Sequence, residues 1–168
     1  VFVPRMTLST PDSDLRVECD MDLDALDEKN PGNIYLRLFA ELGKQDIMRF
    51  AGDMPQQFVR RYPNRPLSVK LSLNGNMREA RVSGLDVSLP TAFRLFAEGH
   101  ATEPMDISRM KAEMKVRATT YDLGFATALA QMPAGMRIPS NTNMNAHVKA
   151  DRQVYEAEMR ITEGRGTV

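Results

Sequence analysis

The stretch that decides the fold runs from residue 15 to residue 24 and reads LRVECDMDLD. Every odd position in it is apolar and every even position is charged. Side chains of a β-strand point alternately to opposite faces, so this pattern predicts a strand with one dry face and one solvated face.

The same alternation recurs along the chain, and polar or charged residues occupy most of the intervening positions. We therefore expect about nine strands in all. Apolar residues occupy every second position in the ranges 36–42, 67–73, 110–118, 144–150 and 155–161.

The turns between these runs favour antiparallel pairing. Asn74-Gly75 supplies the backbone angles that a tight hairpin needs, and Asp151-Arg152 separates two alternating runs. The pattern therefore predicts a mainly β fold, in which neighbouring strands form an antiparallel meander.

Two stretches break the alternation. Residues 44–62 carry apolar side chains at helical spacing, and residues 122–132 form the second such stretch. Each predicts a short amphipathic helix, the first interrupted near Pro55.

The chain also resembles itself when it is shifted by about 76 residues, because the alternation keeps its phase and Asp46 falls on Asp122. Repetition of one supersecondary unit is typical of extended, stackable architectures. We interpret residues 1–168 as a single segment of a longer chain, with approximate repeat units at 6–79 and 80–163.

Composition argues against several classes of protein. Lys and Arg together number 22, as do Asp and Glu, so no net charge favours binding to nucleic acid. No apolar run approaches the roughly 20 residues of a transmembrane helix. Cys19 is the only cysteine, which excludes an internal disulfide and a cysteine-based zinc site.

The sequence offers little for catalysis or metal binding. Residues 20–24 imitate the start of a calcium loop, but Ala25 replaces the required Gly and Pro31 replaces the bidentate Glu. His100 and His147 lie in different repeat units, and neither has a second histidine or a cysteine at helical spacing. We expect no catalytic residue, no metal and no cofactor, and an enzyme is the weakest hypothesis.

Several tracts resemble a known family. A long strand is followed by YDLGF at 121–125, a short helix, a proline-containing loop and EGRGTV at 163–168. LSLNGN at 71–76 and LDVSLP at 85–90 add to the pattern. Together they resemble the AsmA/TamB-like proteins of the Gram-negative envelope.

This resemblance implies a parent chain that is anchored in the inner membrane and crosses the periplasm as a curled, trough-like sheet. Its apolar concave face would bind phospholipid and conduct it to the outer membrane, in support of outer-membrane biogenesis. An outer-membrane β-barrel assembly protein is a candidate partner. The helical stretch 44–62 is longer than such a trough requires, and could cap the groove or seal one end.

The dry-face positions are the expected lining of the groove, and methionines among them supply adaptable apolar surface. A cluster at Arg60, Arg61 and Arg65 could contact a headgroup or a partner, although basic residues also suit a helix C-terminus. The expected lining residues are Val17, Cys19, Met21, Leu36, Leu38, Val69, Leu71, Leu95, Met114, Val116, Val148 and Met159.

A structural or interaction module remains the alternative hypothesis. In it, the dry faces close into a β-sandwich core with helices plugging the ends, and exposed edge strands pair with an outer-membrane assembly partner.

Overall fold

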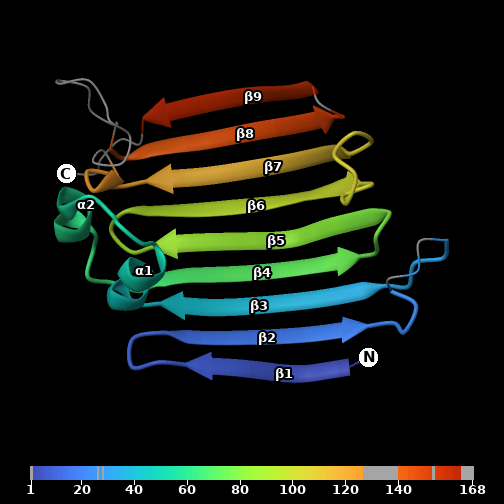
Figure 1. Cartoon of the computed structure of the whole chain (residues 1–168). Helices are drawn as coiled ribbons and strands as arrows, with labels where there is room; N and C mark the ends of the chain where they lie inside the picture. Colours follow the sequence, from blue (N-terminus) through green and yellow to red (C-terminus); the bar gives the residue numbers. More distant parts are fainter. Residues whose placement is uncertain (1, 26, 28, 127–139, 153, 164–168) are drawn as a thin grey trace.

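The computed structural model describes residues 2–25, 27, 29–126, 140–152 and 154–163. These residues form one nine-stranded antiparallel sheet in which every strand pairs with the next along the chain (Figure 1). The predicted meander is therefore confirmed. Its strands are β1 (Phe2–Ser9), β2 (Asp14–Met21), β3 (Ile34–Leu42), β4 (Leu67–Gly75), β5 (Glu79–Leu89), β6 (Phe93–Thr102), β7 (Lys111–Thr120), β8 (Thr142–Asp151) and β9 (Val154–Glu163).

Strand register places apolar positions opposite apolar positions. Val17 of β2 lies opposite Leu38 of β3, which lies opposite Leu71 of β4. Since alternate residues of a strand share a face, this register gathers the apolar side chains on one face and the charged ones on the other.

Two helices lie between β3 and β4 in the chain, α1 (Lys44–Phe50) and α2 (Gln56–Arg61). The predicted helical stretch with a break near Pro55 is thus confirmed. Nζ of Lys44 donates a hydrogen bond of 2.8 Å to the carbonyl oxygen of Tyr62, which ties the start of α1 to the end of α2.

The helices pack on the apolar face at one end of the strands. Phe58, Tyr62 and Phe125 form a tilted aromatic cluster with ring centroids 5.3–5.7 Å apart. This cluster is buried against Leu89 and Ala92, at the end of β5 and in the turn that follows it. We call it the end cluster.

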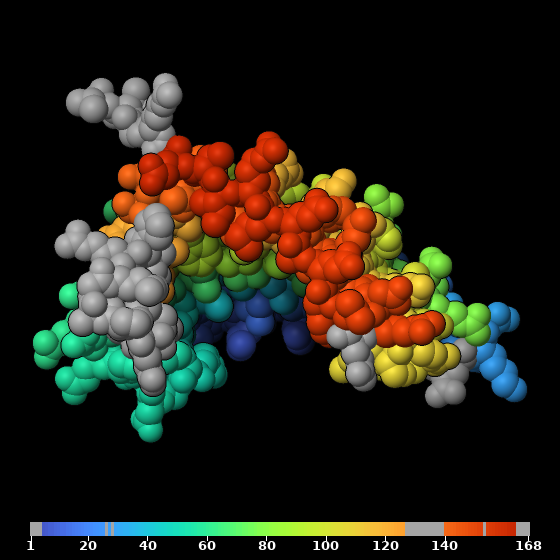
Figure 2. All heavy atoms as spheres, turned by 90° about the horizontal axis from the view of Figure 1, so that it is seen from above, coloured from blue at the N-terminus to red at the C-terminus, as the bar shows by residue number. Residues whose placement is uncertain are grey.

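The sheet is arched, and its concave side is the apolar side that carries the helices. Figure 2 looks along the stack of strands and shows the hollow beneath the arch, with α1 and α2 along one rim. We call this hollow the trough. A closed sandwich is therefore wrong for the described residues, because they form a single sheet and the two helices cover only one end of its apolar face.

The hairpin expected at Asn74-Gly75 exists, but its turn lies further along. Asn74 pairs with Arg81 and Gly75 with Ala80, so both still belong to the ladder. The backbone N–H of Asn76 donates to the carbonyl oxygen of Glu79, which closes the turn after them. The turn expected at Asp151-Arg152 is confirmed, since Arg152 adopts a positive φ of 58° between β8 and β9.

The strand predicted over residues 15–24 ends early, at Met21. Oδ2 of Asp22 accepts a hydrogen bond of 2.8 Å from the backbone N–H of Asn33, and this bond closes a loop. Leu23 is consequently 91% exposed and does not belong to the dry face.

Most of the helix predicted over residues 122–132 lies outside the described residues. The duplication into units 6–79 and 80–163 stays a prediction.

Candidate binding trough

The trough is lined by rows of apolar side chains that cross the sheet from strand to strand. One row passes from Val17 through Leu38 and Leu71, and it reaches Met159 in the last strand. In chain order this row reads Met6, Val17, Leu38, Leu71, Leu85, Ala97, Val116, Ala146 and Met159.

The rows on either side are equally apolar. One reads Leu8, Leu15, Ala40, Val69, Val87, Leu95, Ala118, Met144 and Ile161. The other reads Cys19, Leu36, Leu73, Val82, Gly99, Met114, Val148 and Ala157. No charged or hydrogen-bonding side chain interrupts them, apart from the weakly polar thiol of Cys19.

These rows contain eleven of the twelve predicted lining residues. Met21 begins a fourth row, opposite Ile34 at the end of β2. The structure therefore brings all twelve onto one face of the sheet, as the alternation of the sequence indicates.

The trough is large enough for an extended apolar chain. Eight inter-strand spacings of about 4.8 Å give a length of about 38 Å from β1 to β9. Strands of 8–11 residues give a width of roughly 30 Å before curvature. Such an area exceeds what α1 and α2 cover, because the hydrophobic side chains of the two helices pack in and around the end cluster, at one end of the strands.

Burial within the trough decreases toward both edges of the sheet, and Met6 and Leu8 in β1 are 56% and 61% exposed. Ala40 and Ala97 are only 3% exposed, whereas Met159 and Ile161 in β9 are 58% and 60% exposed. All described residues of β9 from Val154 onward are exposed. The apolar surface thus continues to the edge of the sheet.

The basic cluster predicted at the helices is exposed. Arg60 and Arg61 lie in the last turn of α2, and Arg65 lies in the following loop. Among the described residues these three form no ion pair. They are therefore free to meet an anionic group near this rim of the trough.

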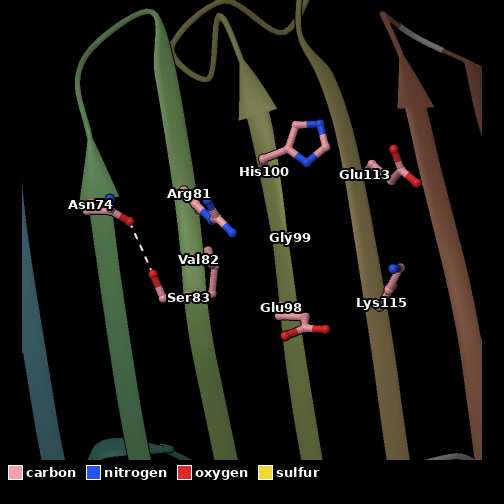
Figure 3. A pocket seen from close by; sticks show the side chains of 9 residues that line it. All are labelled: Asn74, Arg81, Val82, Ser83, Glu98, Gly99, His100, Glu113 and Lys115. Atoms are coloured by element: carbon pink, nitrogen blue, oxygen red, sulfur yellow. Dashed lines mark hydrogen bonds between the residues drawn. The ribbon is translucent and has the colours of Figure 1, made fainter.

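The opposite, convex face is polar. Figure 3 shows Arg81, Glu98, His100, Glu113 and Lys115 standing on adjacent strands around a hollow of about 560 Å³. Their side chains stand apart along the strands, and the drawn hydrogen bond joins Oγ of Ser83 to Oδ1 of Asn74 at 3.2 Å.

His147 contacts Glu113 on this convex face, with 2.6 Å between Nε2 and Oε1. The hydrogen bond from His147 lowers the pKa of the Glu113 carboxyl below its ordinary value, and the charges of Lys149 and His100 act in the same direction. No group of three or more potential ligands among the described residues could hold a metal ion.

None of the described helices is both long and apolar enough to cross a bilayer. No family model, curated protein or solved structure matches the chain.

Sequence reasoning missed a second hollow, on the convex face between Phe39 and Phe96. Both phenylalanines occupy positions that the alternation assigns to the solvated face. This departure from the alternation is the sequence feature from which the hollow could have been predicted. The position of each relative to the other depends on the pairing of four strands.

Proposed function

We propose that this chain is a non-enzymatic segment of an AsmA/TamB-like protein of the envelope, and that its trough binds and conducts phospholipid acyl chains. Transfer would run between the inner and outer membranes and would support outer-membrane biogenesis. The segment would work in the periplasm, with its parent chain anchored in the inner membrane.

The observation that carries this proposal is the continuity of the apolar rows. From Leu8 to Ile161, one row crosses all nine strands without a polar side chain. A water-exposed surface of this size is unfavourable, since each methylene removed from water contributes about 0.8 kcal/mol. An acyl chain that lies along the rows would bury many methylenes, and each would add this contribution.

The position of the helices supports a trough that is open along its length. The end cluster holds α2 against Leu89 and Ala92, at one end of the strands. A ligand that runs from strand to strand would pass beside the helices, so α1 and α2 form a wall of the path (Figure 2).

Methionine and arginine side chains support phospholipid in particular. Met114, Met144 and Met159 lie on the lining and can adapt to chains of varied shape. Arg60 and Arg61 stand exposed on the helical rim, where a phosphate could meet them.

Photocrosslinking with a matched pair of probes tests the proposal. Benzoylphenylalanine would replace Val116, which faces the trough, or Lys115, which points to the convex face in the same strand. The chain would be directed to the periplasm of a Gram-negative host, irradiated in cells, purified and analysed by mass spectrometry for phospholipid adducts.

Adducts are expected at position 116 and not at position 115. Equal adducts at both positions, or none at position 116 in a folded chain, would refute the lipid path.

One observation favours a second function, docking to an outer-membrane β-barrel assembly partner through an edge strand. Among the described residues, β1 and β9 each pair on one side only, and β9 exposes Tyr155, Met159 and Ile161. An unpaired strand edge can bind another strand by main-chain hydrogen bonds. Proline in place of a β9 residue whose backbone N–H points away from β8 would abolish such pairing, and co-purification of the partner would report the loss.

A further inference from the structure

A second hollow lies on the convex face, across the sheet from the trough. Phe39 of β3 and Phe96 of β6 border it, and Lys70 and Asp86 lie between them in the same cross-strand row. Ser72 and Gly84, which pair with each other in β4 and β5, form its floor in the neighbouring row. The hollow encloses about 500 Å³. We call it the phenylalanine hollow.

The fold itself does not require a glycine on this floor. A Cβ atom at Gly84 would lie 3.6 Å from the ring of Phe96, an ordinary contact distance, and the backbone there lies outside the left-handed region. A glycine within a strand weakens the strand and often marks a place where another molecule approaches closely. Bulges next to Ser72 and after Val82 flank the floor on both ladders.

Positive charge surrounds the two rings. The guanidinium of Arg16 lies 5.7 Å and the ammonium of Lys70 lies 5.6 Å from the ring centroid of Phe39. The guanidinium of Arg117 lies 4.9 Å from that of Phe96. Among the described residues these three cations form no ion pair.

The two carboxylates that line the hollow, Glu18 and Asp86, already have partners, and Arg117 at its edge also borders a neighbouring hollow that contains Glu98 and Glu158. Oε1 of Glu18 accepts from Nη2 of Arg5 at 3.0 Å, and Oδ2 of Asp86 accepts from Nη2 of Arg94 at 2.7 Å. Since the chain as a whole has no net charge, the excess of basic over acidic side chains in the lining, Arg5, Arg16, Arg37 and Lys70 against Glu18 and Asp86, is a local property of the hollow.

We propose that the phenylalanine hollow docks an extended, acidic segment of a partner protein, which inserts one aliphatic or aromatic side chain between Phe39 and Phe96. Carboxylates on either side of that anchor meet Arg16, Lys70 and Arg117. Apolar anchors in a pocket supply affinity, and complementary charges supply orientation and rate.

The spacing of the cations fits a protein segment. Arg16 in β2 and Arg117 in β7 occupy one cross-strand row, five inter-strand spacings or about 24 Å apart. An extended segment of about seven residues covers that length at about 3.3 Å per residue. A flat bilayer would touch this convex surface only along its crest (Figure 2).

This docking site does not depend on lipid binding by the trough. The two surfaces lie on opposite faces of the sheet, so variants of Gly84 leave the trough lining intact.

Selection from a displayed library of random twelve-residue peptides tests the proposal on the whole 168-residue chain. Peptides with an apolar residue flanked by Asp or Glu are expected to be enriched. Their affinity, measured by fluorescence anisotropy, should stay within about twofold for Gly84→Ala and fall roughly tenfold for Gly84→Leu, whose side chain fills the hollow.

Circular dichroism would establish that Gly84→Leu is folded, and Ser72→Leu provides a second variant that fills the floor from the neighbouring strand. Enrichment without acidic residues, or no enrichment above background, would overturn the proposal. So would peptide binding by both filled variants that is as tight as binding by the unchanged chain. Binding of phosphatidylglycerol vesicles that is lost in the filled variants would also overturn it, because the occupant would then be a membrane.

Discussion

Ser13 and Asp46 are separated by 33 residues, yet Oγ of Ser13 donates a hydrogen bond of 2.7 Å to Oδ2 of Asp46. Thr10 donates to the same carboxylate oxygen. The turn between β1 and β2 is thereby fastened to the first turn of α1, which begins one wall of the trough. Asp46 is 6% exposed, and these hydroxyl groups solvate its charge.

Replacing Asp46 by Asn is expected to lower the melting temperature at pH 7 by several degrees, because the hydroxyl donors then face a neutral amide. The hydrogen bonds from Thr10 and Ser13, with the charge of Arg49, hold the pKa of Asp46 below its ordinary value of 3.8. A carboxyl with a lowered pKa stabilises the fold above its unfolded pKa, and this contribution is lost as the pH falls through the folded pKa.

The difference in melting temperature between Asp46→Asn and the unchanged chain should therefore shrink below pH 3.8. Thermal scans by circular dichroism at several pH values measure it. A difference that is constant from pH 7 to pH 2 would show that the charge of Asp46 has no stabilising role.

The end cluster and the trough should respond differently to truncation, although both are apolar. Leu89 is 1% exposed among aromatic rings, so Leu89→Ala should lower the free energy of unfolding by about 2–5 kcal/mol. Ile161 is 60% exposed, and Ile161→Ala should cost less than about 1 kcal/mol. Urea denaturation followed by fluorescence or circular dichroism compares the two, and similar costs would contradict the described packing.

Two glycines in neighbouring strands should behave in opposite ways when a methyl group is added. At Gly99, a Cβ would lie 2.3 Å from the carbonyl oxygen of Glu113, so Gly99→Ala should lower the free energy of unfolding by about 1–3 kcal/mol. Gly84→Ala should be close to neutral, since its Cβ meets the ring of Phe96 at 3.6 Å. The order of the two variants in urea midpoints checks the register of β5, β6 and β7.

The contact between His147 and Glu113 should be visible in a titration. The hydrogen bond from His147 keeps the pKa of Glu113 below its ordinary value of 4.5, so His147→Ala should raise it toward that value. Carbon-13 NMR of the labelled glutamate carboxyl measures the change. In the folded protein this pair stabilises above pH 4.5 and loses its effect as the pH falls through the lowered pKa, and an unchanged titration in His147→Ala would contradict the contact.

The period-two pattern predicted the strands and the facing of their side chains, because alternation follows from backbone geometry within each strand. Val17, Leu38 and Val116 could be assigned to one face without knowledge of any pairing. The end of β2 could not be placed this way. The bond between Asp22 and Asn33 that ends the alternation joins residues on either side of a loop.

The turn after Gly75 shows the same limit. The sequence signal at Asn74-Gly75 is local and favours a tight turn, but pairing of these residues with Arg81 and Ala80 extends the ladder beyond it. Cross-strand pairing outweighed local turn preference, since each added pair brings hydrogen bonds and side-chain contacts.

By itself, the sequence determined that the chain is a β-meander with one apolar face and an interrupted helical stretch before β4, because these features depend on neighbours along the chain. Only the tertiary structure decided that the sheet is arched and open, that α1 and α2 form one wall of the trough, and that Phe39 and Phe96 border a basic hollow. These features depend on the register and twist accumulated over several strands, and on contacts such as that of Ser13 with Asp46, which no local pattern encodes.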